Sequence, residues 1–179
     1  MDYPLRKSSA LDWSMSAMAE IIDRLGSFRT RDAERAAALV SEAVWWVTIV
    51  DWTMVRYHPE TYDQILAAAA EGDRTAIEES LAGLRYARNN MGRRIDDADF
   101  VAGPVPQPAQ AAATADWTWR ALPDPCLSAL SPAAREWELD RYRAYQQRLA
   151  GHAVDEAFGT AREFLAGVAA TAASGVLAR

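Results

Sequence analysis

Apolar residues recur at intervals of three and four over long stretches of this chain, the spacing that places them on one face of an α-helix. The first stretch follows Ser8 or Ser9, either of which can cap a helix, and stops before Gly26. The second runs from Thr30–Asp32 to about His58, where Pro59 prevents continuation. Apolar residues occupy most of the circumference of this helix. We therefore predict a rod of about 40 Å at the centre of a bundle or in a subunit interface.

Further helices follow from stop and start signals. A short helix is expected from about Glu60 to Glu71, closing at Gly72, and Thr75 with Glu78 has the spacing of a capping box. That next helix runs to about Ile95. The remaining two are expected from Ser131 to Gly151 and from about Val154 onward. No strand-type alternation persists. The pattern predicts an all-α protein, a bundle of four main helices with additional short ones.

A proline-rich stretch interrupts this periodicity. The sequence GPVPQPAQAAATAD at 103–116 contains three prolines and predicts an extended linker or strap. We divide the chain into a helical core (1–102), a strap with aromatic anchors (103–130) and C-terminal helices that complete the same bundle (131–179). Five aromatic residues are expected to pack in the core or under the strap: Trp117, Trp119, Trp137, Tyr142 and Tyr145.

Composition narrows the classes of function. A net charge of −6 and a pI near 5.0 argue against coating nucleic acid through bulk charge, although a local basic cleft remains compatible with them. One cysteine and two histidines exclude a disulfide framework and a cysteine-based or histidine-rich metal site. No cofactor-binding fingerprint appears, so neither a metal nor a cofactor is expected. The N-terminus lacks the apolar core of a signal peptide, and no apolar run approaches membrane-spanning length. We expect a cytoplasmic protein with no membrane contact.

One arginine breaks an otherwise apolar seam. Arg88 fills a slot between Leu84 and Met91 in the helix expected at 75–95. A guanidinium group there costs free energy unless it is paired or faces a cleft. Asp51 and Glu42 lie among apolar neighbours in the second helix and are candidate partners. Because they are nine positions apart, they point in roughly opposite directions. At most one can meet Arg88 within a subunit, and Asp51 is the better placed.

Two interpretations of Arg88 remain open. In the first, Arg88 has a structural role: it forms a buried ion pair that fixes helix register, or its side chain extends to the surface. Alternatively, Arg88, Asn89, Arg93 and Arg94 line a cleft that holds a phosphate. Arginine suits such a cleft because its planar fork donates two parallel hydrogen bonds to phosphate oxygens.

Two segments resemble HEPN domains (higher eukaryotes and prokaryotes nucleotide-binding). They are Glu42-Ala43-Val44-Trp45-Trp46 through Asp51, and Leu84-Arg85 through Arg88-Asn89. The resemblance covers about 31 to 99. It implies a compact helical bundle that commonly forms dimers. Many HEPN proteins are metal-independent ribonucleases or toxins of defence and toxin–antitoxin systems, with an arginine and a histidine from both subunits at the dimer cleft.

The chain departs from this family at the histidine. The family motif places histidine four to six residues after the arginine, a span in which this chain has Arg93 and Arg94 and no histidine. Arginine stays protonated and cannot carry protons at neutral pH. RNA cleavage needs one group to accept a proton and another to donate one. We therefore expect a degenerate, non-catalytic HEPN-like component that binds or regulates as a homodimer or with a helical protein partner, with RNA or a nucleotide as a further candidate ligand.

Two alternatives stand beside this expectation. One is a metal-independent endoribonuclease that uses Arg88 at a dimer cleft, with His58 supplying the missing imidazole. A histidine at a helix end, however, is more often a capping group for carbonyls. The other is a structural or adaptor bundle in which the motif is coincidental.

Overall fold

The computed structural model describes residues 7–27, 32–93, 95–103, 117–125 and 127–177. The described part is predominantly helical, which confirms the all-α prediction. Its elements are α1 (Lys7–Ser27), α2 (Ala33–Tyr57), α3 (Pro59–Ala68), α4 (Glu71–Asn90), a 3-10 helix η1 (Asp97–Phe100), β1 (Val101–Ala102), β2 (Thr118–Trp119), α5 (Pro132–Ala144), a π-helix η2 (Tyr145–Leu149) and α6 (Val154–Leu177). The two short strands pair antiparallel, a feature that the hydrophobic pattern did not predict.

The ends of α2 lie close to where the sequence predicts them. The Asp32 carboxylate accepts hydrogen bonds from the backbone N–H groups of Glu34 and Arg35, at 3.0 and 3.3 Å. At the other end, the His58 N–H donates to the Met54 carbonyl, and Pro59 opens α3. Side-chain capping and the missing proline N–H thus set both boundaries.

The ends of α4 differ from those predicted. The helix begins at Glu71, so Gly72 lies inside it and Thr75 donates its hydroxyl to the Glu71 carbonyl instead of capping. It ends at Asn90, because Gly92 turns the chain with a φ of 65° that favours glycine. Ile95 therefore lies beyond the helix.

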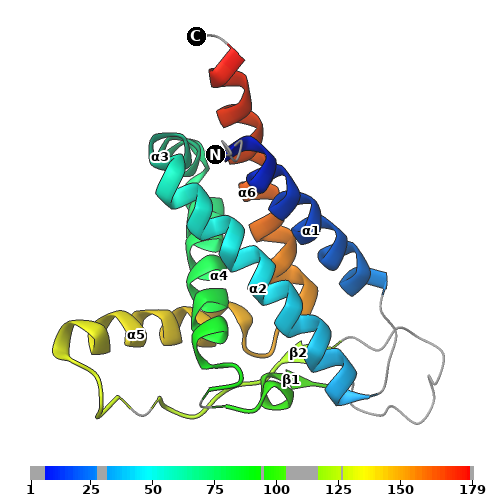
Figure 1. The fold of residues 1–179 in the computed structure, drawn as a ribbon. Helices are drawn as coiled ribbons and strands as arrows, with labels where there is room; N and C mark the ends of the chain where they lie inside the picture. Colours follow the sequence, from blue (N-terminus) through cyan, green and yellow to red (C-terminus); the bar gives the residue numbers. More distant parts are fainter. Residues whose placement is uncertain (1–6, 28–31, 94, 104–116, 126, 178–179) are drawn as a thin grey trace, which may run out of the picture.

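Four long helices form the bundle. In Figure 1, α1, α2, α4 and α6 run alongside one another, while α5 projects across the lower part of α4. The α2 helix contributes much of the core, and its fully buried side chains include Ala43, Val47, Val50 and Met54. Helix α6 packs against α1, α2 and α4 in this bundle, and helix α5 reaches outward from it.

The segment after β1 returns to the core through aromatic residues. Residues 104–116 and Cys126 of the expected strap lie outside the described part. Trp119 is buried among the rings of Tyr145 and Phe158, as expected, and its backbone N–H donates to the His152 carbonyl. Trp137 does not follow this expectation. It is 63% exposed, because α5 projects away from the bundle.

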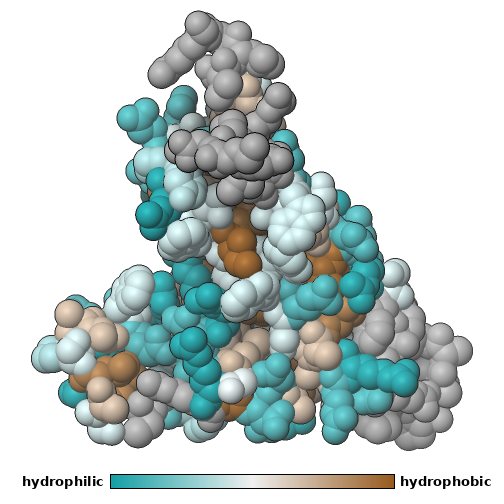
Figure 2. Space-filling model, viewed as in Figure 1, coloured by the Kyte–Doolittle hydropathy of each residue, from teal (hydrophilic) through white to brown (hydrophobic). Residues whose placement is uncertain are grey.

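The surface of the bundle is mixed in character. Figure 2 shows hydrophobic patches exposed between hydrophilic residues on one face. Helix α2 is long and apolar enough to cross a membrane by length and composition, contrary to the expectation that no segment would be. Half of its most apolar window is buried inside the protein, and the core helix of a soluble protein passes the same test.

Candidate functional site

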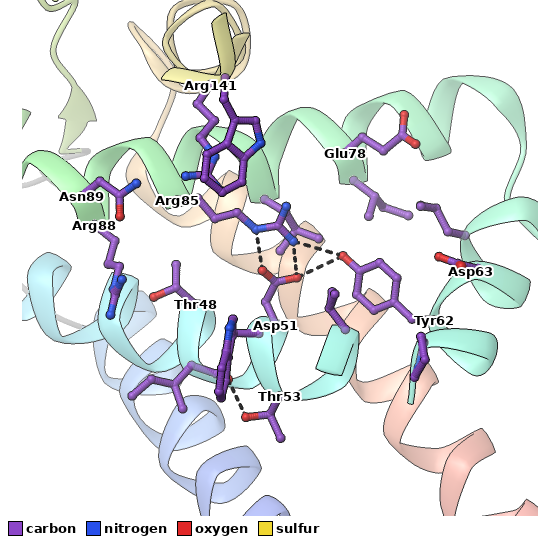
Figure 3. A pocket seen from close by; sticks show the side chains of 18 residues that line it. Thr48, Asp51, Thr53, Tyr62, Asp63, Glu78, Arg85, Arg88, Asn89 and Arg141 are labelled. Atoms are coloured by element: carbon purple, nitrogen blue, oxygen red, sulfur yellow. Dashed lines mark hydrogen bonds and ion pairs between the residues drawn. The ribbon is translucent and has the colours of Figure 1, made fainter. Parts of the chain in front are cut away.

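A buried ion pair lies between α2 and α4. Arg85 donates from Nε to Oδ2 of Asp51 at 2.6 Å and from Nη2 to Oδ1 at 2.7 Å (Figure 3). The Tyr62 hydroxyl of α3 donates to the same Oδ1 at 3.0 Å. The Asp51 side chain is only 2% exposed, whereas that of Arg85 is 32% exposed. The charge of Asp51 is thus neutralised inside the protein, and Arg85 reaches from the core toward solvent.

This pairing corrects the sequence-based expectation for Asp51. The partner of Asp51 is Arg85. Arg88 lies about one helical turn after Arg85 on α4 and is not the partner. Burial raises the pKa of Tyr62, and the negative charge of Asp51 raises it further, so Tyr62 stays a hydrogen-bond donor. Burial alone would lower the pKa of Arg85, but its hydrogen bonds and charge interaction with Asp51 outweigh that effect and raise it.

Arg88 lies outside the apolar seam. Its side chain is exposed and places Cζ 5.1 Å from the centre of the Trp45 ring on α2. Glu42, the other candidate partner, is half exposed and lies 3.6 Å from Nη1 of Arg24. Within the described part of the chain, Arg88 forms no ion pair with either acid. Of the interpretations left open for Arg88, the buried ion pair is therefore excluded, since Leu84 and Ala87 face the core and turn Arg88 to its edge.

Arg88 and the ion pair open onto one cleft of about 1000 Å³. Helices α2, α3, α4 and α5 supply its walls. Figure 3 shows Arg88 and Asn89 at one end, with Arg85 and Asp51 near the middle and Arg141 entering from α5. The full lining is Thr48, Ile49, Asp51, Trp52, Thr53, Val55, Pro59, Tyr62, Asp63, Leu66, Ile77, Glu78, Leu81, Arg85, Arg88, Asn89, Trp137 and Arg141.

Arg141 adds a third guanidinium group to this cleft. Its Cζ lies 3.6 Å from the centre of the Trp137 ring, a stacked arrangement. Burial lowers the pKa of Arg141, and the positive charges of Arg85 and Arg88 also lower it, while Glu138 and Asp51 act in the opposite direction. Arg141 thus lies close enough to Arg85 and Arg88 to be repelled by both. An anion placed among them would relieve that repulsion.

The predicted phosphate-binding set is only partly brought together. Arg88 and Asn89 line the cleft. Arg93 is exposed in the turn after α4 and does not line it, and Arg94 lies outside the described residues. Sequence reasoning missed Arg141, about fifty residues away on another helix. Its spacing of four from Trp137 was the available signal, because such pairs stack on a helix surface.

His58 does not share this site. It joins α2 to α3, whereas the Arg88 guanidinium lies against Trp45 at the middle of α2. At about 1.5 Å per residue, Trp45 and His58 are separated by about 20 Å along the helix axis. Within one chain His58 is therefore too far from Arg88 to act on the same phosphate.

Among the described residues, no group of three or more histidine, cysteine or acidic side chains is arranged to hold a metal ion. No family model, no curated protein and no solved structure matches this chain. The chemistry of the cleft is therefore what indicates a function.

Proposed function

We propose that this chain is a non-catalytic, HEPN-like binding protein whose cleft holds a phosphate-type anion on Arg88, Asn89 and Arg141. The observation that carries this proposal is the convergence of Arg88, Asn89 and Arg141 on one cleft, with neither arginine held in an ion pair among the described residues. Asp51 is already neutralised by Arg85. Neither Arg88 nor Arg141 forms an ion pair in the described part of the chain. Their hydrogen-bond donors are therefore free to bind an anion.

Aromatic stacking favours this role for the two arginines. Trp45 lies under Arg88 and Trp137 lies against Arg141, which restricts how each guanidinium plane can turn. Donors held in place lose less conformational entropy when a ligand binds. Guanidinium groups bind phosphate through two parallel charge-assisted hydrogen bonds. The Asn89 amide adds a neutral donor beside them.

The exposed face of α2 supports self-association. Trp45 and Trp52 are 50% and 57% exposed, and Ile49 lies between them at helical spacing. Large apolar side chains gathered on one helix face are typical of protein interfaces. We propose a second copy of this chain as the partner of this face, in keeping with the dimers of the HEPN family.

A metal-independent endoribonuclease is the alternative function. Arg88 could stabilise negative charge on a scissile phosphate, but a proton carrier is also required. Because His58 of the same chain lies too far away, this alternative needs an imidazole from a second copy. Cleavage of RNA in the presence of a chelator, abolished by Arg88→Ala, would support it over the binding proposal.

Calorimetric titration with inorganic tripolyphosphate tests the binding proposal. Arg88→Ala and Arg141→Ala should each weaken binding by about tenfold, the equivalent of about 1.4 kcal/mol for lost charge-assisted hydrogen bonds. Arg143→Ala is the matched control, because Arg143 lies on α5 but pairs with Asp140 and does not line the cleft. Equal binding by all four proteins, or no binding by the wild type, would contradict the proposal.

A further inference from the structure

We infer that the natural ligand of this cleft is bipolar, with an anionic group at the Arg88 end, an apolar middle and a cationic amine at the Asp63 and Glu78 end. The inference rests on the proposed anion site and extends it to the rest of the cleft. Its basis is the order in which charged and apolar side chains line the walls.

One stripe of α4 contains the whole charge pattern. Glu78, Leu81, Arg85 and Arg88 all line the cleft and follow one another at steps of three and four, so they share one helix face. The negative end of this stripe is Glu78 and the positive end is Arg88. At about 1.5 Å per residue, the two positions are about 15 Å apart along the helix axis.

A second acid strengthens the negative end. Asp63 of α3 also lines the cleft, and Figure 3 shows Asp63 and Glu78 together at the end opposite Arg88 and Asn89. Both acids are exposed, and neither forms an ion pair within the residues that the structure describes. Their charges add at this end. An ammonium or guanidinium group there would meet two carboxylates, because the three arginines of the lining, Arg85, Arg88 and Arg141, lie elsewhere in the cleft.

The ion pair in the middle of the cleft has no net charge. Arg85 and Asp51 cancel each other through two short hydrogen bonds. Apolar side chains line the cleft beside this pair, with Leu81 one turn from Arg85 on α4, and Trp52 and Val55 within one turn of Asp51 on α2. A ligand that spans the two charged ends must therefore place uncharged, apolar atoms between its own charges, because a charge there would be desolvated without a partner.

Titration with a set of alkyl phosphates tests this inference. The probes are aminooctyl phosphate, octyl phosphate without the amine, phosphoethanolamine and inorganic phosphate. Aminooctyl phosphate should bind at least tenfold more tightly than octyl phosphate. Phosphoethanolamine should gain little over inorganic phosphate, because its amine cannot reach the acidic end.

Variants at the two ends separate this inference from the proposed function. Combined Asp63→Asn and Glu78→Gln changes should abolish the advantage of aminooctyl phosphate and leave octyl phosphate unaffected. Glu60→Gln is the control, since Glu60 is an exposed acid of α3 outside the cleft lining. Arg88→Ala should weaken both octyl probes.

The outcomes are distinguishable. Equal affinity for the two octyl probes in the wild type, with both weakened by Arg88→Ala, would overturn the bipolar ligand and leave the anion site standing. An amine advantage that survives the double acid variant would also overturn it. Failure of every phosphate probe to bind the wild type would overturn the anion site, and the bipolar ligand with it.

Discussion

Arg85 and Asp51 meet with two guanidinium N–H groups facing two carboxylate oxygens, at 2.6 and 2.7 Å, and this contact joins α4 to α2. Because Asp51 is almost wholly buried, its charge depends on this one cationic partner and on the Tyr62 hydroxyl. The pair therefore has a structural role. Arg88 beside it forms no such buried ion pair.

Removing Arg85 should destabilise the protein strongly. Arg85→Met leaves the Asp51 carboxylate buried without a cation, a change that costs about 3–5 kcal/mol for fully buried pairs. We expect about 3 kcal/mol, because solvent reaches a third of the Arg85 side chain. Urea unfolding measures the difference. The double variant with Asp51→Leu should recover most of the loss, and a single variant within 1 kcal/mol of wild type would show that the pair is dispensable.

Arg88→Ala should leave stability nearly unchanged. Its described contact is the stacking on Trp45, and exposed contacts of this type are worth about 0.5–1 kcal/mol. The same urea titration should therefore give a free energy of unfolding within about 1 kcal/mol of wild type, while tripolyphosphate binding is weakened. A loss comparable to that of Arg85→Met would instead make Arg88 a structural residue.

Stability should fall as the pH rises above about 10. Burial raises the pKa values of Tyr62 and Tyr145 above the ordinary value of 10.0, and the charge of Asp51 adds to the shift at Tyr62. The unfolded chain releases these protons first, so the stabilisation is complete below pH 10 and is lost at higher pH. Free energies of unfolding between about pH 9 and pH 11 should show this slope.

Phenylalanine variants assign that slope to individual tyrosines. Tyr62→Phe and Tyr145→Phe should each be less stable than wild type at neutral pH, by about 1 kcal/mol for the lost hydrogen bond. Each should also lose less stability between pH 9 and pH 11. Slopes identical to that of the wild type would show that neither tyrosine holds its proton in the folded state.

Two glycine-to-alanine changes should have opposite effects. At Gly83 of α4, an added Cβ would lie 2.7 Å from Leu149 Cδ1 and 3.2 Å from Tyr145 Cα, so the η2 segment would have to move. We expect a loss of about 1–3 kcal/mol. Gly159 of α6 has open space at this position, and alanine there should stabilise the helix by up to about 1 kcal/mol. Thermal unfolding compares the two, and a stabilising Gly83→Ala would contradict this packing.

Self-association should depend on the exposed face of α2. Serine at both Trp45 and Trp52 should convert a dimer to a monomer in sedimentation equilibrium, since both side chains are half exposed on one face. Trp13→Ser serves as the comparison, because Trp13 is 64% exposed on α1. A wild-type protein that stays monomeric at the highest concentration, or a double variant that still dimerises, would exclude this interface.

Local signals explain why α2 was predicted well and α4 poorly. Asp32 and Pro59 fix the ends of α2 through chemistry visible in the sequence. The break before α4 falls at Ala69 and Ala70, two residues that favour helices, so packing of α3 and α4 against the bundle decides it. No residue type in the sequence marks such a break between helices.

The partner of Asp51 could not be chosen from spacing alone. Arg85 and Arg88 are three positions apart on one helix face, and either can reach α2. Which of the two arginines pairs with Asp51 depends on how Leu84 and Ala87 pack in the core, and this packing is set by the assembled helices. The position of Arg141 could not be predicted from the sequence for the same reason, because the crossing of α5 over α4 brings Arg141 to the cleft.

The wide turn of η2 gives the chain a tolerance to a change in its length. The Ala150 N–H donates to the Tyr145 carbonyl, five residues earlier, so Tyr145–Leu149 contains more residues than an α-helical turn would. Removal of one residue there would close the turn to α-helical winding and leave α5 facing α4 much as before. Removal of a second residue would have no wide turn to absorb it and would rotate α5 by about 100°. The segment thus lets the chain shorten by one residue without displacing Arg141 and Trp137 from the cleft.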